Sequence, residues 1–164
     1  MKYIDHKIAE TVIKTNRRMT YTNVKKILAD KDAAVIEEYK ELVPMFEKMA
    51  ELAAILRKKR MKRGSIDFDF PETKVVLDED GHPIDIKPYD RNVATKLIED
   101  FMLIANETVA EDYFWQEIPF VYRTHDKPDS EKIAKLSTFI NNFGYTLHIG
   151  TDEVHPKELQ KLLM

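Results

Sequence analysis

The spacing of apolar residues changes near the middle of the chain, and this change restricts the fold more than any other feature. From Glu41 the apolar residues recur every three or four positions, as in an amphipathic helix with a buried face. Pro44 is tolerated in the first turn of such a helix, and Gly64 is suited to end it. Residues 65–70 then alternate between polar and apolar side chains, which is typical of a half-buried strand. The sequence therefore predicts an α+β fold.

The segments before this helix are predicted to be short. Tyr3–Asn16 mixes β-branched with polar residues and is expected to be extended. Thr20 or Thr22 can cap a short helix that continues through Asp30, and a second helical segment is expected from Ala33.

The second half of the chain is predicted to contain a small antiparallel sheet packed with several α-helices. Asp80-Gly81 is a hairpin signal, since it suits the positive φ that such turns require. Asp90 is expected to cap the next helix, and Gly144 to close the one after it. The predicted elements are a strand over Thr73–Leu77, a strand through Ile84 and Ile86, a helix over Arg91–Trp115, a strand over Phe120–His125, a helix over Ser130–Phe143 and a helix over Pro156–Leu163.

The size of the chain predicts one core. A chain of 164 residues and 19.3 kDa is expected to expose about 8,500 Å² of the roughly 28,000 Å² accessible in its unfolded form. Apolar residues make up 43% of the chain and only 4 are Gly, which excludes a disordered or collagen-like protein. The absence of Cys is consistent with a cytoplasmic location, and no segment is apolar enough to predict a membrane span.

The net charge of −3 conceals a strongly polarised middle of the chain. The basic segment, defined as Arg57–Arg63, carries six positive charges in seven residues. The following stretch, 67–82, carries six acidic residues and one Lys, a net of −5. Residues Arg57, Lys58, Lys59, Arg60 and Lys62 are therefore candidates for phosphate contacts, the alternative being a solvated helix end.

Few residues have the spacing of a catalytic or metal site. Asp67 and Asp69 could share Mg²⁺, but their alternation with apolar residues favours the solvent side of a strand. The acidic residues at 78–80 lack the spacing of a calcium loop and are expected to form a turn. The five His have no zinc-site spacing. Spacing alone therefore predicts no metal site beyond the alternative at Asp67 and Asp69, and it identifies no catalytic motif.

Two groups of polar residues interrupt apolar or extended segments. Glu99 and Asn106 lie two turns apart on one stripe of the predicted helix over Arg91–Trp115, so they form either a ligand site or a buried hydrogen-bond network. Tyr122, Arg123 and His125 could contact a phosphate, or could be ordinary surface and packing residues.

Four stretches together resemble the middle of the catalytic domain of one enzyme family, the ribonuclease II or RNB family of processive 3′-to-5′ exoribonucleases. They occur in the family's order and spacing, and the similarity extends over nearly the whole chain. These stretches are Val12–Tyr21 (VIKTNRRMTY), Arg63–Phe68 (RGSIDF), Leu97–Glu107 (LIEDFMLIANE) and Pro119–His125 (PFVYRTH).

The resemblance implies roles for individual residues. Tyr21 and Glu99 match family positions that recognise ribose, and a hydroxyl with a carboxylate is suited to reading a 2′-hydroxyl. Phe68 lies near the position where the family uses an aromatic ring to stack a terminal base. The remaining matched residues belong to the wall of the RNA channel: Arg63, Asn106, Tyr122, Arg123 and His125.

The resemblance also implies what this stretch lacks. Family members hold Mg²⁺ with an Asp cluster upstream of the segment matching Tyr3 and use an Arg-rich motif downstream of the segment matching Met164. We therefore expect residues 1–164 to be a single, partial RNB domain that binds no Mg²⁺ itself and is inactive alone. In the parent enzyme the partner would be the 3′ end of single-stranded RNA. The alternative is a non-catalytic RNA-binding or scaffold module derived from the same fold.

Removal of neighbouring parts of such a domain exposes surface that they would cover. Tyr3–Asn16 and one face of the predicted helix over Arg91–Trp115 would lose their packing partners. We therefore expect this chain to self-associate.

Overall fold

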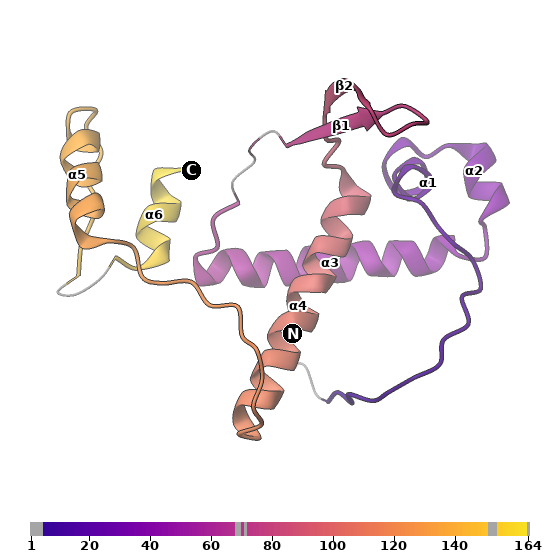
Figure 1. Ribbon diagram of the computed structural model, residues 1–164, viewed down its shortest axis with the longest axis horizontal. Coiled ribbons are helices and arrows are strands. Elements are labelled where there is room, and N and C mark those ends of the chain that lie inside the picture. Colours follow the sequence, from indigo (N-terminus) through magenta and orange to yellow (C-terminus); the bar gives the residue numbers. More distant parts are fainter. Residues whose placement is uncertain (1–4, 68–69, 71, 151–153, 164) are drawn as a thin grey trace. The chain divides into compact units, whose positions relative to one another are not determined.

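The structure is a computed structural model, and it describes residues 5–67, 70, 72–150 and 154–163. Its helices and one two-stranded antiparallel sheet confirm the α+β prediction (Figure 1). The chain divides into two compact units, of which the first comprises Met1–Leu56 and Asp69–Val109 and the second comprises Arg57–Phe68 and Ala110–Met164. In order, the elements are α1 (Tyr21–Lys25), the π-helix η1 (Lys26–Asp30), α2 (Ala33–Glu38), α3 (Val43–Arg63), β1 (Thr73–Leu77), β2 (Pro83–Pro88), α4 (Val93–Trp115), α5 (Ser130–Asn141) and α6 (Pro156–Leu162).

The first unit packs around a small apolar cluster. Its buried members are Val24 of α1, Ile27 of η1, Phe46 of α3 and Ala94 of α4. Thr20 begins α1 as predicted, because its hydroxyl accepts a hydrogen bond from the backbone N–H of Asn23 at 3.2 Å. This cluster brings the segment around α1 against the first turns of both α3 and α4.

The sheet is a hairpin with little burial. β1 pairs with β2 in antiparallel register, with Val75 opposite Ile86 and a register shift between Val76 and Leu77. Gly81 has φ of +85°, which confirms the predicted turn. The hairpin residues are exposed apart from Val76, which is partly buried.

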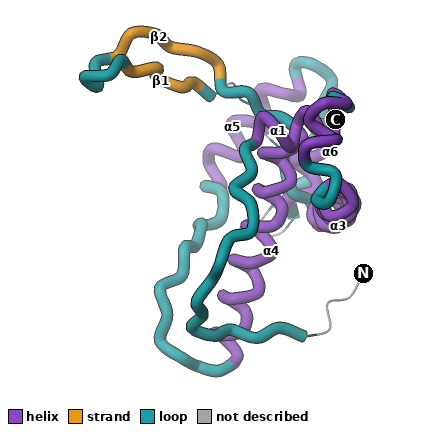
Figure 2. Tube along the Cα trace, turned by 90° about the vertical axis from the view of Figure 1, so that its right-hand side faces the viewer, coloured by secondary structure: helices purple, strands orange, loops and turns teal. Residues whose placement is uncertain are grey.

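Two further predicted strands are wrong within the described residues. Residues 65–67 and 70 form no strand, and Phe68 and Asp69 lie outside the described residues. The Ser65 carbonyl instead accepts a hydrogen bond from the Gln160 side chain at 2.7 Å. Phe120–His125 also forms no strand, and its residues are exposed. Figure 2 shows this connection between α4 and α5 as a loop.

The basic segment ends α3 in a hydrogen-bonded cap. The N–H of Gly64 bonds to the carbonyl of Met61, and the N–H of Ser65 bonds to the carbonyl of Arg60, which is the Schellman arrangement. Gln160 of α6 donates to the Met61 carbonyl at 3.0 Å as well as to Ser65. Helix α6 is thereby attached to the end of α3.

The second unit has its own apolar cluster. Ile133 of α5 is buried with Leu147 and Val154, and Leu159 and Leu162 of α6 pack against them. The side chain of Asp129 accepts a hydrogen bond from the N–H of Lys132 and begins α5. Helix α5 ends at Asn141 rather than Phe143, and Gly144 adopts φ of +81° after it.

Most of the buried apolar residues that the structure describes belong to two small clusters, one in each unit. Among the described helices, none has both the length and the apolar content that crossing a membrane requires.

Gly64→Ala is expected to destabilise the chain more than Gly81→Ala. Gly64 has φ of +104°, and a Cβ there would lie 2.9 Å from both the backbone N and the Cγ of Lys157. Gly81 also has positive φ, but nothing lies within 4 Å of its missing Cβ. We expect losses in the free energy of unfolding of about 3 kcal/mol and about 1 kcal/mol respectively, measured by urea unfolding with circular dichroism. Equal losses would show that α6 does not constrain Gly64.

Candidate functional site

Helix α4 begins at a side-chain cap formed by Asn92. The Asn92 Oδ1 accepts hydrogen bonds from the N–H groups of Ala94 at 3.0 Å and Thr95 at 3.3 Å. In return, the buried Thr95 hydroxyl accepts from the Asn92 N–H and donates to the Asn92 carbonyl, both at 2.9 Å. The predicted cap at Asp90 is therefore wrong by two residues, because Asn92 has a hydroxyl partner three positions later and Asp90 does not.

Asp90 instead connects α4 to α1. Its Oδ2 accepts hydrogen bonds from Asn92 Nδ2 at 3.1 Å and from Lys25 Nζ at 3.2 Å. These bonds, first from Asn92 and then from Lys25, lower the pKa of Asp90 below its ordinary value. The start of α4 is thus attached to the helix that carries Tyr21.

Glu99 is held by a two-point ion pair with Arg91. Arg91 Nε donates to Glu99 Oε1 at 3.2 Å, and Arg91 Nη2 donates to Glu99 Oε2 at 2.9 Å. The Arg91 side chain is 24% exposed and that of Glu99 is 39% exposed. Parallel contacts of this kind fix the plane of a carboxylate as well as its position.

Two of the predicted motifs meet at a cavity of about 470 Å³ in the first unit. Residues 18–21, at the end of the stretch Val12–Tyr21, form one part of its lining. Leu97 and Ile98, from the stretch Leu97–Glu107, form another, and Glu99 follows Ile98 directly. The complete lining is Arg18, Met19, Thr20, Tyr21, Val24, Phe46, Met49, Ala94, Leu97 and Ile98.

The walls of this cavity are mostly apolar, and its polar side chains come from the stretch Val12–Tyr21. Tyr21 lines the cavity and is 48% exposed, so part of this residue is reachable from solvent. Arg18 adds a cation to the same lining. An apolar cavity with a few polar groups is the common form of a binding site for a small group.

Other predicted site residues lie elsewhere. Asn106 is exposed further along α4, so the alternative of a buried hydrogen-bond network is wrong for this residue. The second unit contains Arg63 and the segment with Tyr122, Arg123 and His125, all of them exposed. Phe68 lies outside the described residues.

The basic segment separates into two kinds of side chain. Arg57 and Arg60 are half-buried, and Arg60 Nη1 donates to Ser65 Oγ at 3.3 Å. Lys58, Lys59 and Lys62 are exposed. These lysines and the exposed Arg63 are therefore the cations of this segment most open to a phosphate group.

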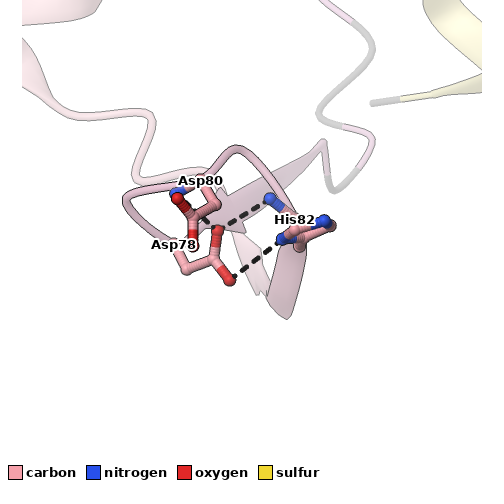
Figure 3. A group of neighbouring side chains, drawn as sticks. All are labelled: Asp78, Asp80 and His82. Carbon is pink, nitrogen blue, oxygen red and sulfur yellow. Dashed lines mark hydrogen bonds and ion pairs between the residues drawn. The ribbon is translucent and has the colours of Figure 1, made fainter.

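The described residues contain one group of three close metal-binding side chains. Asp78, Asp80 and His82 lie at the hairpin turn, and all three are exposed (Figure 3). Asp78 Oδ1 accepts from the N–H groups of Asp80 at 3.0 Å and His82 at 2.8 Å, so it already stabilises the turn. Mg²⁺ prefers oxygen ligands in octahedral geometry, and this set with its imidazole does not suit it.

The sequence did not predict the ion pair between Arg91 and Glu99. The pairing joins residues eight positions apart, across the start of a helix, and such pairs have no sequence motif. Only an indirect signal for this pair was present in the sequence. Glu99 interrupts a mostly apolar helix stripe and so requires a partner, and Arg91 is a nearby cation.

The contribution of Asp90 to stability is expected to depend on pH. Its lowered pKa means that the charged form stabilises the fold above the ordinary value of 3.8, and that this stabilisation is lost as pH falls through the lower, folded-state pKa. Asp90→Asn should therefore destabilise the chain at about pH 7 and have less effect near about pH 3. Urea unfolding at both pH values measures this, with Asp126→Asn at an exposed position as the control. A loss for Asp90→Asn that does not change with pH would contradict the assignment.

Comparison with known proteins gives consistent results. A family profile described as the RNB domain matches residues 1–164. Ribonuclease R of Thermotoga maritima is 40% identical over 163 residues, which cover 99% of this chain and 22% of that protein. Ribonuclease R 2 of Lactococcus lactis subsp. lactis is 41% identical over 150 residues, which cover 90% of this chain and 23% of that protein.

Solved structures agree with the sequence matches. RNase R of Mycoplasma genitalium in complex with ribose methylated single-stranded RNA has a TM-score of 0.69 and 30% identity, over 87% of this chain and 22% of that chain. Its complex with double-stranded RNA gives the same TM-score and identity, over 25% of that chain. The chain thus spans between 22% and 25% of the length of these relatives. With the family profile matched from end to end, the chain belongs to the RNB domain family.

Proposed function

We propose that this chain forms part of the RNA channel of a Mg²⁺-dependent, processive 3′-to-5′ exoribonuclease of the ribonuclease R type. In this proposal residues 1–164 are a partial RNB domain that recognises ribose and phosphate but does not hydrolyse RNA alone. The enzyme would act in the cytoplasm, with single-stranded RNA as substrate. The observation that carries the proposal is the cavity at which residues 18–21 and the Leu97–Ile98 segment meet.

The chemistry of the two motifs fits a ribose. A 2′-hydroxyl both donates and accepts a hydrogen bond, whereas the DNA sugar lacks this group. The Tyr21 hydroxyl can donate to the ribose oxygen, and the Glu99 carboxylate can accept from the ribose hydroxyl. The same pair has no such contact to make with deoxyribose, so RNA is favoured.

Phosphate and base contacts would come from exposed residues of the second unit. Lys58, Lys59 and Lys62 offer positive charge to the phosphate backbone, as Arg123 does from the α4–α5 connection. The Tyr122 ring lies 5.3 Å from that of Phe120, which lies 4.7 Å from Tyr113 at the end of α4. This aromatic row would give Tyr122 a fixed position beside Arg123 and His125.

In this proposal, hydrolysis is carried out by residues of the longer enzyme outside residues 1–164. The solved complexes of Mycoplasma genitalium RNase R with single-stranded and double-stranded RNA support RNA as the ligand. The hairpin group of Asp78, Asp80 and His82 includes an imidazole, which is not a ligand that Mg²⁺ prefers. When bound in the longer enzyme, Mg²⁺ would activate the attacking water. This chain would hold the strand by its sugars and phosphates.

The chain is expected to bind single-stranded RNA more tightly than DNA of the same sequence, without shortening it. Tyr21→Phe and Glu99→Gln should each reduce this preference by roughly two- to tenfold, since each removes about one hydrogen bond. Fluorescence anisotropy with 3′-labelled strands across a salt series measures the binding, and a gel in Mg²⁺ checks strand length. Tyr145→Phe and Glu111→Gln, both at exposed positions, are the matched controls.

Three results would contradict this proposal. Equal binding of RNA and DNA would contradict ribose recognition. Binding that does not weaken with salt would contradict the phosphate contacts. Shortening of the RNA that is lost in Tyr21→Phe or Glu99→Gln would place a complete active site in this chain.

We further propose that the isolated chain self-associates through the exposed hairpin. Val75, Leu77, Ile84 and Ile86 are between 49% and 66% exposed. An isolated two-stranded sheet is barely stable in water, so a second copy that covers these side chains would stabilise it. Pro83 and Pro88 weaken the outer edge of β2 for pairing, which favours the edge of β1.

Ile86→Lys is expected to reduce this self-association, because it places a charge on the exposed apolar surface. Sedimentation velocity at several protein concentrations measures the loss. Lys74→Ser is the control, since it changes an exposed residue of β1 without removing apolar surface. A wild-type chain that remains monomeric at all concentrations would contradict self-association, and an unchanged oligomer in Ile86→Lys would contradict the role of the hairpin.

A further inference from the structure

We infer that Arg91 is a positioning residue for ribose recognition, which it serves by orienting the Glu99 carboxylate. This inference rests on the proposed function, because it assumes that Glu99 contacts the ribose. Arg91 is therefore assigned an effect on the choice between RNA and DNA, although the inference requires no contact between Arg91 and the nucleic acid.

The geometry of the pair supports this role. Arg91 Nε and Nη2 contact the two different oxygens of Glu99, at 3.2 Å and 2.9 Å. A carboxylate has about four acceptor positions, so two remain after this pairing. Because Arg91 fixes the plane of the carboxylate, it also fixes the direction in which the remaining positions accept a ribose hydroxyl.

Without Arg91, Glu99 would lose its orientation. The Glu99 side chain is 39% exposed, and a long acidic side chain at such a position samples several rotamers in water. Ordering it on RNA binding would then oppose the gain from one hydrogen bond. The pre-formed ion pair removes most of this entropic loss before RNA arrives.

Arg91 itself is held by its neighbours in the chain. Asn92 caps α4 and fixes the backbone that follows Arg91. Asp90 bonds to Lys25, which lies one helical turn after Tyr21 on α1. The dipeptide Asp90-Arg91 thus connects to both proposed ribose contacts, to Glu99 directly and to the Tyr21 helix through Lys25.

The test compares two substitutions of Arg91 by the ratio of RNA affinity to DNA affinity. Arg91→Gln should reduce this ratio to that of Glu99→Gln, roughly two- to tenfold below wild type. Arg91→Lys retains the charge but cannot make the two parallel contacts, so its ratio should lie between these values. The double variant should lose no more than either single variant, since both act on one contact. Lys135→Gln, which removes an exposed positive charge from α5, is the control.

The outcomes separate this inference from the proposed function. If Glu99→Gln leaves the ratio unchanged, the proposed ribose contact fails. If Glu99→Gln lowers the ratio while both Arg91 variants retain the wild-type value, the positioning role is overturned. It is also overturned if Arg91→Gln weakens RNA and DNA binding equally, or if the losses in the double variant add. Circular dichroism of each variant checks the fold, and Arg91→Lys remains informative should Arg91→Gln not fold.

Discussion

The capped start of α4 is the constraint on which the first unit depends. Asn92 supplies the hydrogen bonds that begin the helix, and its side chain also bonds to Asp90. Asp90 then reaches α1 through Lys25, and Arg91 reaches forward to Glu99. Asp90, Arg91 and Asn92 therefore determine where α4 begins, how it connects to α1 and how the Glu99 carboxylate is oriented. The apolar cluster around Ile27 and Ala94 adds burial to the same junction.

Several contacts likewise meet at the end of α3 in the second unit. Gly64 allows the chain to turn within contact distance of Lys157, and the Gln160 side chain bonds to two carbonyls beside that turn. Arg60 bonds to Ser65 across it. Arg60 therefore has a structural role at this turn, and Arg57 and Arg60 are half-buried while the other cations of the basic segment are exposed. Composition alone treats these cations as equivalent.

Local signals predicted the helices better than the strands. Thr20, Pro44 and Gly64 act within one or two turns of their own positions, so spacing was sufficient to predict helix ends there. A strand needs a partner elsewhere in the chain, and alternation in residues 65–70 or the β-branched and aromatic residues of 120–125 cannot supply one. The candidate site shows the same difference between local and non-local signals. Tyr21 and Glu99 are predicted from the family resemblance, whereas the ion pair between Arg91 and Glu99 is visible only in the folded structure.

Net charge is a poor guide to an RNA contact in a chain of this kind. Charges separated by more than about 8 Å are largely screened at physiological ionic strength, so a phosphate responds to its near neighbours and not to the total of −3. Under the proposed function, the exposed lysines near the end of α3 would provide such a neighbourhood, and their attraction would be the same for RNA and DNA. Discrimination therefore requires groups that meet the sugar itself. In the proposed function, Tyr21 at the apolar cavity and the Glu99 carboxylate, which follows the lining residue Ile98 on α4 and is paired with Arg91, have the chemistry for that task.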